Sequence, residues 1–136
     1  MTETLVVEPR TTSRAAVLVM WSLRVVVALL FLYVGIDKFS GARVWVRIFD
    51  AIGVGQWFRY LTGALQVGGA TLVLVPRTSL LGIGILACTM LGACIAWLTV
   101  LHSPATMATP AALFVMLLAV GAFSWRARGI DVASSK

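Results

Sequence analysis

The chain has 136 residues, 60% of them hydrophobic, and a mean hydropathy of +0.99. This composition is far more apolar than that of a soluble globular protein, and the length leaves room for one domain. Eleven Lys and Arg residues against five Asp and Glu residues give a net charge of +6. The basic residues are dispersed at the ends of apolar runs, where they would meet lipid headgroups, so we expect a lipid bilayer and no nucleic acid as a partner.

Residues 1–14 are polar and predict an N-terminal tail. The apolar run 15–36 follows, interrupted only by Ser22 and Arg24, and at about 1.5 Å per residue it can cross a hydrocarbon core of about 30 Å. A cleaved signal peptide is the alternative, but the run exceeds a normal signal sequence and no small-x-small cleavage motif follows it. We therefore expect a retained first membrane span.

Charged and aromatic residues are mixed in the segment 37–59. Within it, residues 43–50 predict a short amphipathic helix at the membrane interface, which Gly53 and Gly55 would end. The second apolar run, 60–75, is rich in glycine and is closed by Pro76. Its glycines allow close contact between helices in lipid, so we expect a packing helix that spans the membrane.

Two further apolar runs complete the bundle. The run 80–101 is the longest without a charged residue and predicts a third span, whereas 102–110 contains two prolines and predicts a turn. The run 111–125 predicts a shorter fourth span. We therefore expect an all-α integral membrane protein with a four-transmembrane-helix bundle at 15–126, a short interfacial helix between its first two spans, and a C-terminal tail at 127–136.

An even number of spans places both termini on one side of the membrane. The basic residues then form two groups: Arg10, Arg14, Arg77, Arg126, Arg128 and Lys136 on the side of the termini, and Lys38, Arg43, Arg47 and Arg59 on the other. Because basic residues are enriched in cytoplasmic segments, the larger group predicts that both termini are cytoplasmic.

Arg24 lies in the middle of the first span, where a charged side chain is unfavourable by at least ~2.5 kcal/mol and normally faces the interior of a bundle. On a helix it shares one stripe with Ala28, Phe31, Gly35 and Lys38. This stripe would run from the middle of the membrane to its far interface, and Arg24 is the residue at which function is best sought.

Gln66 and Thr89 lie at the same depth as Arg24, roughly 14 to 15 Å from one membrane surface, so the three can form a buried cluster. No carboxylate lies within a predicted span to neutralise Arg24. One interpretation is that Arg24 binds an anionic or carbonyl-bearing ligand, such as a quinone or a lipid phosphate, or an acid on a partner protein. The other is that it bonds to backbone carbonyls and water as a structural clasp.

Asp37 and Lys38, at the end of the first span, also allow two interpretations. They can form a mouth for ligand or proton entry, or they can be ordinary interface charges. The same choice applies to aromatic residues near the span ends, which can line a pocket or form an interfacial belt: Trp45, Trp57, Tyr60, Trp97 and Trp125.

The metal-ligating residues are sparse. Cys88 and Cys94 lie on different faces of one predicted helix, and His102 is the only histidine. We expect no metal site, no covalently bound cofactor and no catalytic activity of the chain on its own.

Several short motifs resemble the DoxX family of small bacterial membrane proteins. They comprise Arg24 in the first span, the segment 31–39 (Phe-Leu-Tyr-Val-Gly-Ile-Asp-Lys-Phe), Ile52-Gly53, the segments 63–69 and 72–77, and residues 90–93. The resemblance covers roughly residues 20 to 125. It implies a four-helix bundle in the bacterial cytoplasmic membrane and an association with redox processes, since the family is named after a subunit of a thiosulfate:quinone oxidoreductase.

The resemblance also shows a departure, because the family usually has Glu at the position of Gln66. Two functions follow as expectations. The first is an accessory or scaffolding subunit of a quinone-linked or oxidative-stress membrane assembly, with a protein partner or a second copy of the chain. The alternative is a quinone-reactive oxidoreductase subunit, or a small-molecule transporter, with a midplane site at Arg24 and Gln66 and a quinone or lipid as its ligand.

Overall fold

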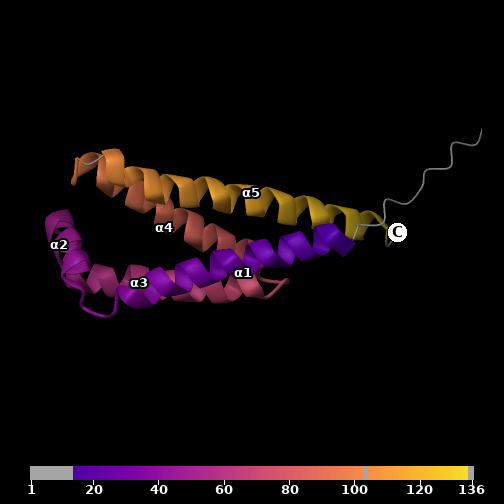
Figure 1. The fold of residues 1–136 in the computed structure, drawn as a ribbon, viewed down its shortest axis with the longest axis horizontal. Coiled ribbons are helices and arrows are strands. Elements are labelled where there is room, and N and C mark those ends of the chain that lie inside the picture. The colour runs from indigo at the N-terminus through magenta and orange to yellow at the C-terminus, as the bar shows by residue number, and fades with distance from the viewer. Residues whose placement is uncertain (1–13, 103, 135–136) are drawn as a thin grey trace, which may run out of the picture.

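The computed structural model describes residues 14–102 and 104–134, and within these ranges every regular element is an α-helix. The helices are α1 (Arg14–Asp37), α2 (Arg43–Ile52), α3 (Gln56–Leu74), α4 (Ser79–Thr99) and α5 (Pro104–Ser134) (Figure 1). The polar tail expected at 1–14 lies outside the described residues apart from Arg14, which begins α1.

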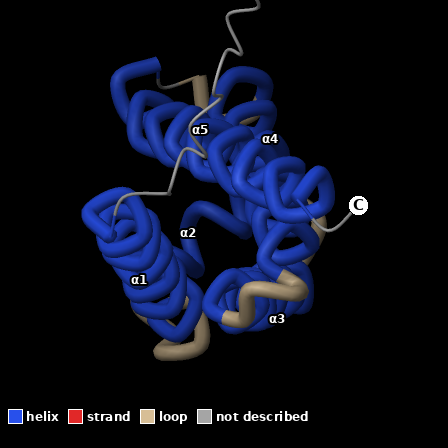
Figure 2. The backbone as a smooth tube through the Cα atoms, turned by 90° about the vertical axis from the view of Figure 1, so that its right-hand side faces the viewer, coloured by secondary structure: helices blue, strands red, loops and turns tan. Residues whose placement is uncertain are grey.

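The four long helices form an elongated bundle, and α2 lies across one end of it (Figures 1 and 2). Helices α1 and α3, α3 and α4, and α4 and α5 pack as neighbouring pairs, while α1 and α5 touch more sparsely. The described ends of the chain lie together at the end opposite α2 (Figure 1). This arrangement confirms the all-helical fold.

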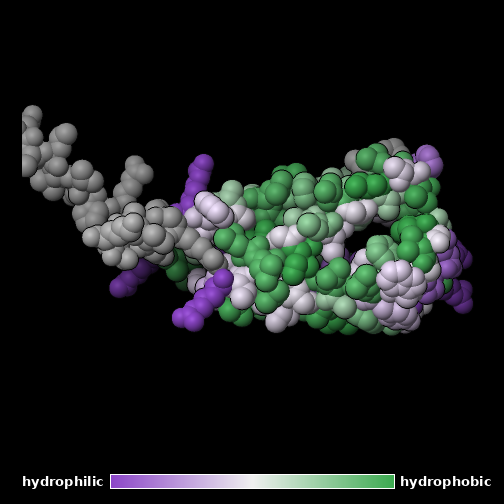
Figure 3. Space-filling model, turned by 180° about the vertical axis from the view of Figure 1, so that it is seen from behind, coloured by the Kyte–Doolittle hydropathy of each residue, from purple (hydrophilic) through white to green (hydrophobic). Residues whose placement is uncertain are grey.

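Within the described part of the chain, three helices are long and apolar enough to cross a membrane: α1, α4 and the part of α5 from Ala108 to Arg126. Large apolar side chains such as Leu29, Leu81 and Leu118 cover the outside of the bundle (Figure 3). A protein surrounded by water rarely exposes apolar patches of this extent. Helix α3 is long enough to cross a membrane but is not apolar enough to be counted with these three, because Arg59, Gln66 and its glycines reduce its mean hydropathy.

The core of the bundle is apolar and draws on all four long helices. It includes Val27 and Phe31 of α1, Val73 of α3, Leu86 of α4 and Leu117 of α5. The stripe predicted on α1 is confirmed, since all of its residues from Arg24 to Lys38 are buried.

Glycines bring the backbones together at two places. A Cβ on Gly63 would lie 3.1 Å from the carbonyl oxygen of Gly35, and a Cβ on Gly82 would lie 2.6 Å from that of Gly69. The first contact joins α1 to α3 and the second joins α3 to α4, as expected for small residues at helix interfaces in lipid. By contrast, Gly68 faces open space and takes no part in this packing.

Most of the turn predicted at 102–110 is helical in the structure, although His102 does lie between α4 and α5, outside both helices. Helix α5 begins at Pro104 and passes through Pro110, and the chain reverses instead at Val100–His102, where His102 has φ 47°. A proline at the first helical position costs nothing, because the missing N–H would have no helical acceptor there. Pro110 removes one further hydrogen bond, which a long helix packed against α4 tolerates. The helix also continues beyond the fourth apolar run, to Ser134.

The helix expected near residues 43–50 is present as α2, and the predicted stop is confirmed. Gly53 adopts φ 78°, and its N–H donates to the carbonyl oxygens of Phe49 and Asp50. The helix is strongly amphipathic, with Phe49 buried and Arg43 and Arg47 exposed. Its place at a membrane interface stays a prediction.

Candidate functional site

A pocket of about 640 Å³ lies between α2, α3 and α4. Helices α3 and α4 touch at Gly69 and Gly82 and diverge from there toward α2 (Figure 1), so the pocket fills the space between their separated ends. Figure 3 shows a hollow in the apolar surface near this end of the bundle. The volume is in the range of known small-ligand sites, about 300–1,000 Å³.

One face of α4 forms the long wall of the pocket. Gly84, Cys88, Gly92 and Ala96 recur every four residues along this face. A Cβ added to Gly84 or Gly92 would meet no atom within 4 Å. These glycines therefore leave room beside the helix, and do not bring another backbone close.

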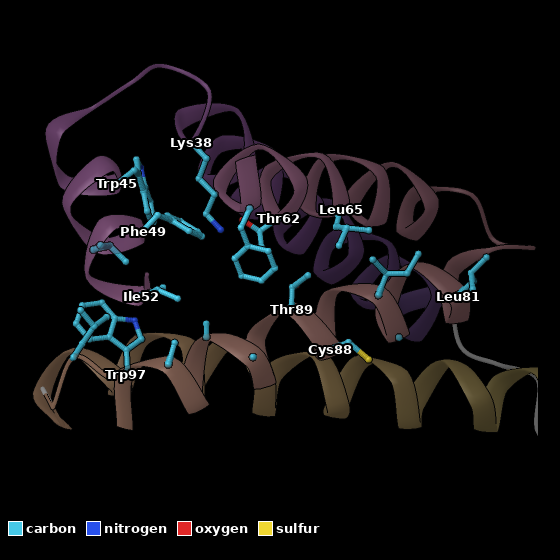
Figure 4. Close-up of a pocket in the computed structure, with 18 of the residues that line it drawn as sticks. Lys38, Trp45, Phe49, Ile52, Thr62, Leu65, Leu81, Cys88, Thr89 and Trp97 are labelled. Atoms are coloured by element: carbon cyan, nitrogen blue, oxygen red, sulfur yellow. The ribbon is translucent and has the colours of Figure 1, made fainter. Parts of the chain in front are cut away.

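The pocket is long as well as apolar. Its walls on α4 extend from Leu80 to Trp97, which is about 26 Å along a helix. Leu65 on α3 and Phe49 on α2 face the same space (Figure 4). The space therefore suits an elongated apolar group.

Lys38 is the only charged side chain among the described residues that line the pocket. It is 7% exposed, and its Nζ points into the space beneath α2 (Figure 4). The Nζ lies 5.2 Å from the ring centroid of Trp45 and 5.8 Å from that of Phe49, which are favourable cation–π distances. Burial lowers the pKa of Lys38 from 10.5 to about 8.

The Lys38 ammonium group forms no hydrogen bond or ion pair with any of the described residues, so its hydrogens are directed to aromatic faces and to the pocket. An ammonium group has three donors, and desolvating it without acceptors is unfavourable. This makes Lys38 the polar focus of an otherwise apolar pocket.

A small network holds Lys38 in place. Asp37 Oδ2 accepts a hydrogen bond of 2.6 Å from Trp45 Nε1, which fixes the indole above the Lys38 side chain. Arg59 Nη1 donates to the backbone oxygen of Lys38 at 2.9 Å, and Arg59 Nη2 donates to Tyr60 Oη at 2.8 Å. The end of α1 is therefore tied to both α2 and α3.

The midspan residues are arranged differently from the predicted cluster. Arg24 is buried, and its Nη2 donates to Ser124 Oγ on α5 at 3.3 Å. Gln66 is 1% exposed, and neither of its amide atoms has a hydrogen-bond partner among the described residues. Thr89 donates to the backbone oxygen of Leu86 at 2.8 Å. Gln66 therefore bonds to neither Arg24 nor Thr89.

The structure thus divides the candidate residues between two places. Lys38 and Thr89 line the pocket, and Asp37 orients one of its walls. Arg24 and Gln66 lie on the inner faces of α1 and α3, outside the residues that line it. Ser124 was missed by sequence reasoning, although a single serine in the apolar run 111–125 was a signal.

The aromatic residues follow both of the expected patterns. Trp45 and Trp97 line the pocket, whereas Trp57 and Trp125 are strongly exposed on the outside of the bundle, as in an interfacial belt. The two cysteines are unbonded, and Cys88 contributes to the pocket wall. No group of three metal-ligating side chains occurs within the described ranges.

Comparison with known proteins gives one match. The family model of the DoxX-like family matches residues 22–120, which include Arg24, Gln66 and the whole of α2, α3 and α4. Neither a curated protein nor a solved structure matches the chain significantly. The matched segment covers most of the sequence and contains the pocket. The chain is a membrane protein that belongs to the DoxX-like family.

Proposed function

We propose that this protein is a membrane subunit that binds a lipid-soluble ligand in the pocket between α2, α3 and α4. The head of the ligand is a hydrogen-bond acceptor that contacts Lys38, and its apolar body lies along α4. One observation carries the proposal: the Lys38 side chain is buried, its ammonium group has no hydrogen bond or ion pair with the described residues, and it points into a large apolar pocket. Quinone carbonyls and lipid headgroups both supply such an acceptor.

The orientation of the pocket supports a ligand that arrives from the bilayer. We take α3 as the fourth span, since its 19 residues extend about 28 Å and it packs between α1 and α4. Lys38 and the exposed arginines of α2 are then near one membrane surface. A ligand with its head at Lys38 and its body along α4 has the orientation of a lipid in that leaflet.

The site is therefore displaced from the midplane position expected at Arg24 and Gln66. The redox association that the DoxX resemblance implies makes a quinone one natural member of the ligand class. We place both termini in the cytoplasm, because Arg14, Arg77 and Arg126 lie at the end opposite α2 and basic residues favour that side. The pocket then opens in the outer leaflet of the membrane.

Two glycines provide a matched test. Gly92 and Gly68 both lie in helix interiors, and an added Cβ at either meets nothing within 4 Å, but only Gly92 faces the pocket. We expect Gly92→Leu to fill the pocket and abolish binding of both decylubiquinone and oleate, whereas Gly68→Leu binds them as the wild type does. Quenching of Trp45 and Trp97 fluorescence in nanodiscs reports occupancy. Equal binding to both variants would show that the ligands bind elsewhere.

A second candidate function is that of an accessory subunit, favoured by the outer face of α3. Ala64, Gly68 and Thr71 are exposed along one side of this helix, and the small-residue spacing suits close contact with a helix of a redox partner. In this case Gly68→Leu should release a redox protein that co-purifies with the wild type in mild detergent, and Gly92→Leu should retain it. Release by neither variant would argue against docking at this face.

A further inference from the structure

The pocket contains a positive charge that no pocket residue neutralises. Among the described residues that line it, Lys38 is cationic and none is a carboxylate. The carboxylate next to Lys38 in the sequence, Asp37, accepts hydrogen bonds from Trp45 Nε1 and Ser40 Oγ. Asp37 therefore holds Trp45 in the wall of the pocket, and the Lys38 ammonium stays available to a ligand.

A second cation lies behind Lys38. The Arg59 side chain is 4% exposed, and its guanidinium donates to the Lys38 backbone oxygen at 2.9 Å. Lys38 and Arg59 are both buried, and Asp37 offsets only one of their two positive charges. The end of α1 therefore has a net positive charge in a poorly solvated environment. A neutral acceptor would satisfy hydrogen bonds of Lys38 but would leave this charge uncompensated, whereas an anion would do both.

The apolar walls add little selectivity for a ligand that comes from the membrane. Lipid tails are as apolar as the leucine and isoleucine side chains of the pocket, so moving a hydrocarbon chain from lipid to the groove changes its free energy only slightly. The affinity must therefore come from the head. The groove follows one face of a single helix, α4, between Leu80 and Trp97, which provides a track for one chain.

From this charge and shape we infer that the ligand is a single-chain anionic amphiphile, whose carboxylate or phosphate pairs with Lys38 and whose chain lies over Gly84 and Gly92. The inference rests on the proposed ligand-binding function and specifies its ligand class. In this proposal Lys38 selects the charge of the ligand head. The face of α4 with Gly84 and Gly92 holds the hydrocarbon chain. Trp45 and Phe49 keep water away from the ion pair.

The test compares oleate with oleyl alcohol, which has the same chain and a neutral head. Binding is measured by native mass spectrometry and by tryptophan fluorescence in zwitterionic nanodiscs. We expect the wild type to bind oleate at least about tenfold more tightly than the alcohol, since a charge-assisted hydrogen bond is stronger than a neutral one. Dodecyl phosphate and dodecanoate, compared in the same way, distinguish a phosphate head from a carboxylate head.

Two substitutions of Lys38 complete the test. Lys38→Met should remove the preference for oleate while the alcohol still binds, and Lys38→Arg should retain the preference. Thermal unfolding followed by circular dichroism verifies that both variants fold. If Lys38→Met does not fold, the wild type and Lys38→Arg still decide the question through the ratio of oleate to alcohol affinity.

The outcomes separate this inference from the proposed function. Equal affinity for oleate and oleyl alcohol would contradict an anionic head group and leave the pocket as a ligand site. Tight binding of decylubiquinone without binding of oleate, dodecanoate or dodecyl phosphate would have the same meaning. Failure of every probe to bind, or binding that Gly92→Leu does not reduce, would overturn both.

Discussion

The bundle has two buried cations on the same stripe of α1, and their surroundings differ. Arg24 lies in the packed part, beside the core residues Val27 and Ala28, and its guanidinium bonds to Ser124 of α5. Lys38 lies in the open part, where α3 and α4 have diverged and the ammonium faces a pocket. Burial of a charge is common to both places, so burial alone does not identify a ligand site. The space in front of the charge makes the difference.

The glycines of α4 show the same contrast and give the largest expected effect. Gly82 belongs to the packed part, where a Cβ would lie 2.6 Å from the Gly69 oxygen and 2.7 Å from the Val73 nitrogen. Gly84, two positions along, faces open space in the pocket. We expect Gly82→Leu to lower the free energy of unfolding by about 3 kcal/mol or more, because rigid backbone cannot move aside.

Gly84→Leu should cost little stability and should instead reduce ligand binding, as Gly92→Leu does. Unfolding in mixed detergent micelles, followed by circular dichroism, measures the stability of both variants. A loss of stability that is as large in Gly84→Leu as in Gly82→Leu would mean that the packed and open parts are not distinct.

Lys38 provides the next effect, through the pH dependence of stability. Its pKa is about 8 in the folded protein and 10.5 when unperturbed. Below pH 8 both states are protonated, and the folded state bears the full cost of burying the charge. Between pH 8 and 10.5 the unfolded state binds more protons, so stability rises with pH across this window, by at most about 3 kcal/mol.

Lys38→Met should remove this dependence, since it has no charge to bury. The ligand-free variant is therefore expected to be more stable than the wild type at pH 7, and the difference should shrink as the pH approaches 10. Asp37, Arg59 and Tyr60, whose side chains form hydrogen bonds around the end of α1, stay unchanged in the variant. Melting temperatures at pH 7 and 9.5 test the point, and parallel pH profiles for both proteins would refute it.

The packed part predicts a smaller effect at Ser124. Ser124→Ala removes an acceptor of the Arg24 guanidinium at a site that is almost inaccessible. We expect a loss of about 1–3 kcal/mol in the free energy of unfolding, with unchanged affinity for oleate and decylubiquinone. A loss of ligand affinity without a loss of stability would instead make Arg24 part of a binding site, as the midplane hypothesis holds.

The sequence predicted the buried stripe of α1 better than it predicted the pocket or the partner of Arg24. Helical periodicity placed Arg24 and Lys38 on one buried stripe, because the period alone determines which residues share a face. A pocket with Lys38 at its mouth was only one of two alternatives, and its place between α2, α3 and α4 was not predicted. Whether a glycine such as Gly82 or Gly84 packs or leaves space depends on where two helices cross and diverge, and a single sequence does not contain that geometry. For the same reason Ser124 could not be assigned to Arg24, from which it is separated by most of the chain.

The smallest expected effect concerns the wall above Lys38. Trp45→Phe retains an aromatic face but removes the indole N–H that donates to Asp37, and the exposed Trp57 provides a matched control, Trp57→Phe. We expect Trp45→Phe to lower the free energy of unfolding by about 1 kcal/mol, and to weaken the binding of oleate a few fold, since the ring above Lys38 is no longer held. Trp57→Phe should change neither quantity. If both variants bind oleate like the wild type, Asp37 and Trp45 do not orient the site, and the difference between the two parts of the bundle rests on Lys38 and the open face of α4 alone.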